Sequence, residues 1–244
     1  FSQYLLWLGH LLQGNLGFSW KLDQSVASLL GQRLPKTVIL VGFSTIIALV
    51  IAVPIGLWQA VRRNKAVDYT FTALSFLFYA APTFFVGTVL ILVFAVKLQW
   101  FGPEAPQGGV VDDLTNWRDL TLPVVTLALV TIALFSRYMR SAVLDNITED
   151  YVRTARAKGA SSRRVLWRHV MRNSLIPIAT LLGLSIPGIL SGALITESVF
   201  NYPGMGFLFF QSAQNQDYPV LLGFVIVVAI GTVVGSLLAD IAYG

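Results

Sequence analysis

Side chains that commonly perform catalysis are scarce in this sequence. It has no cysteine, and its two histidines, His10 and His169, lie far apart and form no metal-ligand pair. It also has no G-x-x-x-x-G-K-[ST] loop for binding a nucleoside triphosphate. We therefore expect no catalytic residue, no metal and no bound cofactor. The polar residues that are present are more typical of a recognition surface than of a catalytic site.

These polar residues gather in one basic stretch, residues 144–172, whose pattern predicts a helical hairpin. Thr148 is a candidate N-cap ahead of acidic residues in a first helical turn. Gly159 suits a left-handed cap at the end of that helix, with positive φ. Ser161 or Ser162 can begin the second helix. Small side chains leave a low profile around the turn: Ala155, Ala157 and Ala160.

Two interpretations of this hairpin stay open. Arg164, Arg168 and Arg172 lie on one face of the second helix, which is typical of a helix resting on anionic lipid. In the other interpretation the hairpin is a docking element, and a partner protein grips the low turn around Gly159.

The elements that carry the hairpin are predicted to be membrane helices. Hydrophobic residues make up 55% of the chain and charged residues 12%, about half of the roughly 25% usual for a soluble domain. Mean hydropathy is +0.70, so a soluble enzyme or nucleic-acid binder is nearly excluded. The charges cluster between five uncharged stretches that are long enough to cross a bilayer as helices. The predicted spans are about 36–61, 69–97, 120–143, 173–197 and 218–241.

The basic residues predict the orientation of these spans. Twelve of the 17 Lys and Arg residues lie within residues 62–65 and 137–172, where spans one and two and spans three and four are joined, which places both stretches on the cytoplasmic side. Residues 1–35 are then extracytoplasmic, and residues 1–20 have the pattern of an interfacial helix. An exported N-terminal segment needs something to export it, so we expect a sixth span to precede Phe1.

The solute pathway is less sharply predicted than the hairpin. Hydroxyl side chains in the fourth span can line a pathway or bond back to the preceding helical turn. The loop 197–219 is a candidate extracytoplasmic gate and binding-protein contact, although its aromatic residues also suit an interfacial belt. The candidate pathway and gate residues are Ser185, Ser191, Thr196, Glu197, Phe200, Tyr202, Gly204 and Asp217.

Several motifs resemble one transporter family. The segment Thr154-Ala-Arg-Ala-Lys-Gly159, followed by a basic helix, resembles the EAA loop of permease subunits in binding-protein-dependent ABC importers. Tyr202-Pro-Gly-Met-Gly206, Asp217-Tyr-Pro219 and Gln99-Trp-Phe-Gly102 are similar to the B-type permease of the dipeptide/oligopeptide family. The resemblance covers nearly all 244 residues and keeps the motifs in order.

The resemblance implies an all-α membrane protein, a polytopic helical bundle of the type I ABC importer permease kind. It implies a bacterial inner-membrane location and four kinds of partner: a second homologous permease, two cytoplasmic ATPases that bind ATP and Mg, an extracytoplasmic binding protein, and lipid. It also implies that the loop at 144–172 couples the permease to the ATPases. Ala155 and Gly159 match the EAA pattern, and the other residues expected in the coupling loop are Tyr151, Thr154, Ala157, Lys158, Ala160, Arg164 and Arg168.

The expected solutes are dipeptides or oligopeptides, and the alternatives are glutathione, nickel chelates or oligosaccharides. The match has departures: Arg153 stands where the EAA pattern begins with Glu, and Met171-Arg172 replaces its later Leu-Pro. A secondary transporter is the less favoured rival, because the uncharged stretches lack the mid-membrane ionisable groups that ion coupling uses. An intramembrane enzyme is the weakest alternative.

Overall fold

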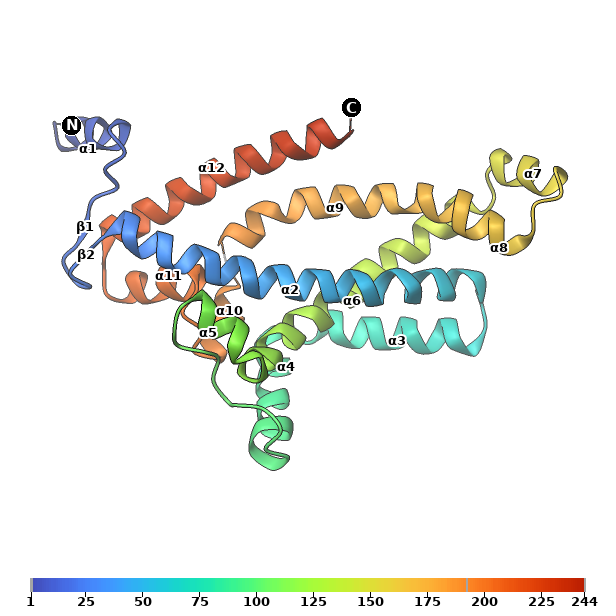
Figure 1. Cartoon of the computed structure of the whole chain (residues 1–244), viewed down its shortest axis with the longest axis horizontal. Helices are drawn as coiled ribbons and strands as arrows, with labels where there is room; N and C mark the ends of the chain where they lie inside the picture. Colours follow the sequence, from blue (N-terminus) through green and yellow to red (C-terminus); the bar gives the residue numbers. More distant parts are fainter. Residues whose placement is uncertain (1, 192, 244) are drawn as a thin grey trace. The chain divides into compact units, whose positions relative to one another are not determined.

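The computed structural model describes residues 2–191 and 193–243, and these residues form helices joined by short loops (Figure 1). The chain divides into two compact units. The first unit comprises Phe1–Gly42, Gly87–Val124 and Ser185–Gly244, and the second comprises Phe43–Val86 and Val125–Leu184. Each unit therefore takes segments from distant parts of the sequence.

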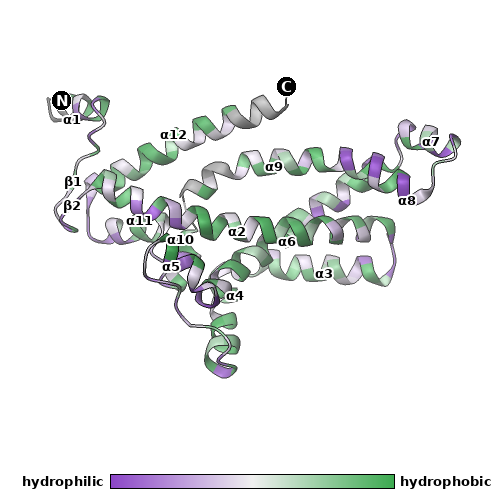
Figure 2. Ribbon diagram, viewed as in Figure 1, coloured by the Kyte–Doolittle hydropathy of each residue, from purple (hydrophilic) through white to green (hydrophobic). Residues whose placement is uncertain are grey.

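Three helices in the described part of the chain are long and apolar enough to cross a membrane. They are α2 (Val26–Val61), α6 (Trp117–Asn146) and, over Tyr218–Leu237, α12 (Tyr218–Tyr243). Figure 2 shows apolar residues along α2 and the described part of α12, and hydrophilic residues at the hairpin between α7 and α8. Helix α2 begins at Val26, ahead of the predicted start at residue 36.

The predicted span 69–97 is not one continuous helix. Helix α3 (Ala66–Ala80) ends before Pro82, and α4 (Thr83–Leu90) continues into the π-helical segment η1 (Ile91–Lys97). The two halves meet at 103°. Because Pro82 disfavours the helical conformation of the residue before it, Ala81 is extended, with φ −71° and ψ 130°. Counted as one span, the bent pair raises the number of candidate spans among the described residues to four, against five predicted.

The fourth predicted span, 173–197, is also interrupted. Helix α9 (Met171–Ser191) covers most of it, and a separate short helix, α10 (Leu194–Val199), follows. The side chain of Ser191, a candidate pathway residue, lies outside the described part of the structure. Ser185 is half-buried in α9.

The second unit has a core formed by α2, α6, α9 and the hairpin between α7 and η2. Gly56 of α2 lies so close to α6 that an added Cβ would be 2.6 Å from the Ser136 carbonyl oxygen and 2.7 Å from Met139 Cβ. The absence of a side chain at Gly56 therefore lets the two backbones approach closely. The buried residues of this core are Ala52, Leu57, Ala60, Phe135, Met139, Val143, Val152, Val165, Val170 and Ile178.

The first unit packs the start of α2 against α11 (Met205–Gln214) and α12. A short antiparallel pair, β1 (Phe18–Ser19) and β2 (Gln24–Ser25), leads into α2. The helix predicted within residues 1–20 is present as α1 (Ser2–Leu12). The other elements of this unit include α5 (Val110–Thr115), and its buried core residues are Val26, Leu29, Leu30, Met205, Leu208, Val220 and Phe224.

Candidate functional site

The predicted hairpin is present in the second unit, and its turn has the expected geometry. Helix α7 (Asp150–Ala157) is followed by Gly159, whose φ is +80°. The Gly159 N–H donates to the Arg156 carbonyl at 2.9 Å, and the Ala160 N–H donates to the Ala155 carbonyl at 3.1 Å. These are the two hydrogen bonds of a Schellman motif, which ends a helix with a left-handed residue. The prediction of positive φ at Gly159 is confirmed.

Of the two helix caps predicted for the hairpin, one is confirmed and the other is wrong. Ser161 caps the second helix, α8 (Ser162–Arg164), because its Oγ accepts from the Arg164 N–H at 3.4 Å. Thr148 is not the N-cap of α7. Glu149 holds that position without a side-chain bond, and the Thr148 hydroxyl instead donates to the Asp145 carbonyl at 2.9 Å. Thr148 therefore bonds back into the preceding turn.

The hairpin is fixed to the helices that carry it. Val152 of α7, and Val165 and Val170 of the π-helical segment η2 (Val165–Val170), are buried in the same core as α2 and α6. The Tyr151 hydroxyl donates to Asn146 Oδ1, at the end of α6, at 2.7 Å. Because apolar burial and a hydrogen bond both hold it, the hairpin is a rigid extension of the second unit.

The outer side of the hairpin is hollowed and basic. A cavity of about 570 Å³, here called the hairpin groove, opens over the turn. Ala157 does not line it but is exposed beside it. The other eight predicted coupling residues line the groove together with His169: Tyr151, Thr154, Ala155, Lys158, Gly159, Ala160, Arg164 and Arg168.

Arg153, which replaces the expected glutamate, lies on the exposed surface of α7. Its Nη1 is 3.4 Å from Asp150 Oδ1, and the two side chains are 76% and 94% exposed. An ion pair this exposed contributes about 0–1 kcal/mol. Arg153 therefore keeps most of its charge available to a partner surface.

The predicted gate residues of the first unit form a buried polar network. The Tyr202 hydroxyl lies 2.7 Å from the Lys36 carbonyl oxygen and 2.8 Å from Asp113 Oδ2. Lys36 Nζ is 2.7 Å from Asp113 Oδ1. Burial, with Asp113 beside it, raises the pKa of the Tyr202 phenol above its usual value, so the hydroxyl stays protonated. This network joins the start of α2 to α5 and to the loop after α10.

Glu197 is the second centre of this network. Its Oε1 accepts from the Thr37 hydroxyl at 2.9 Å and from the Ala193 N–H at 3.2 Å, and its Oε2 accepts from the Phe207 N–H at 2.9 Å. The Glu197 carboxylate occupies the space that a side chain at position 204 would need. A Cβ added to Gly204 would lie 2.5 Å from Glu197 Cδ. Asp217 accepts a hydrogen bond from the Ser19 hydroxyl.

The candidate gate residues thus hold the loop 197–219 in place within the first unit. Five of them are buried in this structure: Thr196, Glu197, Phe200, Tyr202 and Asp217. Contact of the candidate gate residues with a solute stays a prediction. The sequence interpretation missed the partners Lys36, Thr37 and Asp113. Lys36 could have been noticed as the charge that borders the first uncharged stretch, but nothing in the sequence pairs it with Asp113, 77 positions away.

The sequence and fold both match known proteins. The family model described as "Binding-protein-dependent transport system inner membrane component" matches residues 52–244. The chain is 42% identical to the oligopeptide transport system permease protein AppB of Bacillus subtilis, over all of this chain and 78% of that protein. It is 34% identical to the dipeptide transport system permease protein DppB of Haemophilus influenzae, over 98% of this chain and 77% of that one.

Two solved structures share the fold at low sequence identity. A chain of the inward-facing MetNI methionine ABC transporter matches with a TM-score of 0.68 and 17% identity, over 88% of this chain and 96% of that one. A chain of an amino acid ABC transporter with histidines matches with a TM-score of 0.65 and 15% identity, over 88% and 92%. The chain therefore shares its fold with chains of these ABC transporters.

Proposed function

The chain belongs to the family of inner membrane components of binding-protein-dependent transport systems, and we propose that it carries dipeptides or oligopeptides through an ATP-driven importer. Proteins of this family are multi-pass permeases of the inner membrane. The peptide assignment is supported by relatives that are named as oligopeptide, peptide or dipeptide permeases and are 34–42% identical over almost the whole chain. Glutathione, nickel chelates and oligosaccharides are the competing solutes.

The working complex contains further subunits. A second homologous permease completes the pathway, two cytoplasmic ATPases bind ATP and Mg, and an extracytoplasmic protein delivers the peptide. This division of labour is supported by the sequence, which has no phosphate-binding loop of its own. The chain thus contributes a path and a mechanical connection, while ATP hydrolysis takes place on its partners.

The hairpin groove is the observation that carries the coupling role. Its lining is concave and basic, with Lys158, Arg164 and Arg168 around the low turn at Gly159. Such a surface suits an ATPase surface that presents acidic side chains. Because Val152 and Val165 are buried among residues of α2 and α6, displacing the hairpin displaces those helices of the second unit as well.

The proposal is tested by reconstituting the full complex in vesicles. Peptide uptake is measured with ATP inside the compartment that holds the ATPases and with loaded binding protein on the other side. We expect peptide accumulation that needs both ATP and binding protein. Uptake of a nickel chelate, glutathione or an oligosaccharide, without peptide uptake, would reassign the solute. Uptake driven by an ion gradient without ATP would contradict the importer assignment.

A further inference from the structure

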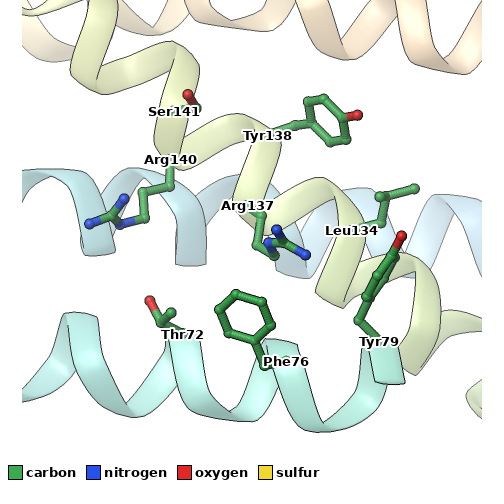
Figure 3. A pocket seen from close by; sticks show the side chains of 8 residues that line it. All are labelled: Thr72, Phe76, Tyr79, Leu134, Arg137, Tyr138, Arg140 and Ser141. Atoms are coloured by element: carbon green, nitrogen blue, oxygen red, sulfur yellow. The ribbon is translucent and has the colours of Figure 1, made fainter. Parts of the chain in front are cut away.

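The second unit contains a cavity that none of the roles above uses. It has a volume of about 520 Å³ and lies between α3 and α6 (Figure 3). Pockets for small organic ligands typically measure about 300–1,000 Å³, so this one could hold a short peptide or a large part of one. It is lined by Thr72, Phe76 and Tyr79 from α3, and by Leu134, Arg137, Tyr138, Arg140 and Ser141 from α6.

Arg137 is the central cation of this cavity. Its side chain extends from α6 toward α3, where Phe76 and Tyr79 stand (Figure 3). The guanidinium carbon is 4.6 Å from the centre of the Phe76 ring and 5.3 Å from that of Tyr79. Two aromatic faces attract the cation and hold it in place, but they do not neutralise its charge.

The other arginine of the cavity is already paired. Arg140 donates through Nε and Nη2 to the two oxygens of Asp68, at 2.7 and 2.8 Å. Ion pairs among the described residues involve Lys36, Arg140 and Arg153, and Arg137 has no carboxylate within ion-pair distance there. The cavity wall therefore presents a positive charge that lacks an anion from this chain.

The burial of Arg137 makes this charge informative. Arg137 is half-buried and lies nine residues before the end of α6. Partly burying an ionised group without a counter-ion is costly, so this charge is best explained by an anion that binds in the cavity.

We propose that this cavity is a subsite for the carboxylate of the transported solute, bound by Arg137. This inference rests on the proposed function, in which the anion is the C-terminal carboxylate of a short peptide. The planar guanidinium matches a carboxylate through two parallel hydrogen bonds. Hydroxyl groups of Thr72 and Ser141, which also line the cavity, can accept or donate to the peptide backbone. A lipid phosphate presents similar chemistry, so the test separates the two sources.

The test compares tri-alanine with tri-alanine amide in the complete reconstituted complex, each delivered by saturating binding protein. Arg137→Gln should lower uptake of the free acid about tenfold or more, because a hydrogen-bonded charge pair contributes roughly 1.5–3 kcal/mol. Uptake of the amide should change less than about twofold, since it has no carboxylate for Arg137 to bind. The binding protein's own preference is the same for every variant, so it cancels. Arg137→Lys, which keeps the charge but not the planar fork, should give an intermediate loss.

Arg62→Gln is the matched control. Arg62 also stacks on an aromatic ring, with its guanidinium carbon 5.6 Å from the centre of Trp58, but it does not line the cavity. This variant should import both peptides as the wild type does. ATP hydrolysis stimulated by the amide shows whether the Arg137 variants are folded and assembled.

Three results would overturn the proposal, each in a distinguishable way. Equal losses of acid and amide in Arg137→Gln would mean that Arg137 acts on structure. A loss of acid uptake that occurs in vesicles with anionic lipid and disappears in pure phosphatidylcholine vesicles would assign the site to the headgroup of an anionic lipid. Import of neither peptide by the wild type would refute the proposed function itself.

Discussion

Asp68, two residues into α3, and Arg140, near the C-terminal end of α6, form an ion pair with two hydrogen bonds, at 2.7 and 2.8 Å. Asp68 is 3% exposed and Arg140 is 28% exposed. Asp68 Oδ2 also accepts from the Asn64 N–H at 3.0 Å, which fixes the turn between α2 and α3. One carboxylate of α3 therefore connects α6 to the turn between α2 and α3.

We expect Asp68→Asn to lower the thermal stability of the purified complex strongly. Removing one member of a buried pair leaves the other charge uncompensated, at a cost of about 3–5 kcal/mol for fully buried pairs and less here because Arg140 is partly exposed. The double variant Asp68→Asn with Arg140→Gln should recover part of the loss. Melting temperatures of the wild type, both single variants and the double variant measure this coupling. Strictly additive losses would show that the pair contributes nothing.

Gly159→Val should reduce ATP-coupled uptake while leaving the membrane bundle intact. No atom lies within 4 Å of a Cβ added at Gly159, so the penalty is conformational: about 1–2 kcal/mol for a left-handed backbone with a branched side chain. Gly159→Asn is the matched control, because asparagine adopts positive φ more readily. Uptake in vesicles and co-purification of the ATPases are the measurements. Normal import by the valine variant would contradict a coupling role for this turn.

Gly204→Ala should destabilise the loop 197–219. The new Cβ would lie 2.5 Å from Glu197 Cδ and 2.6 Å from both carboxylate oxygens, whose hydrogen bonds to Thr37 and Phe207 would have to shift. Overpacking of this kind costs about 1–3 kcal/mol. Gly109→Ala is the control, since nothing lies within 4 Å of its added Cβ. Binding-protein-stimulated ATP hydrolysis and thermal unfolding should both respond to Gly204→Ala. Equal behaviour of the two variants would exclude the steric explanation.

The orientation is tested by labelling single cysteines with an impermeant thiol reagent, and the chain offers no native cysteine to interfere. Lys65→Cys, in the exposed turn before α3, should react only from the cytoplasmic side. Val111→Cys in α5, where the native side chain is 73% exposed, should react only from outside. The opposite labelling would place the hairpin groove on the wrong side for an ATPase.

Local features were accessible from the sequence, and long-range pairings were not. The turn at Gly159 follows from the conformational freedom of one residue, and Ser161 caps its helix through a neighbour three positions away. The break before Pro82 was also accessible, because proline acts on the residue that precedes it, but the long uncharged stretch suggested a single span. In contrast, Tyr202 meets Asp113 across 89 positions, and no local pattern predicts that contact.

The backbone of the hairpin turn satisfies its own hydrogen bonds before any partner arrives. Gly159 and Ala160 donate inside the turn, so the proposed docking surface does not have to fold on contact. Ordering a flexible residue costs about 1–2 kcal/mol, and a disordered loop of this length would incur that cost each time a partner re-engaged it. A pre-ordered turn can instead bind and release its partner in every transport cycle without refolding. Ordering of the turn then does not limit the turnover rate.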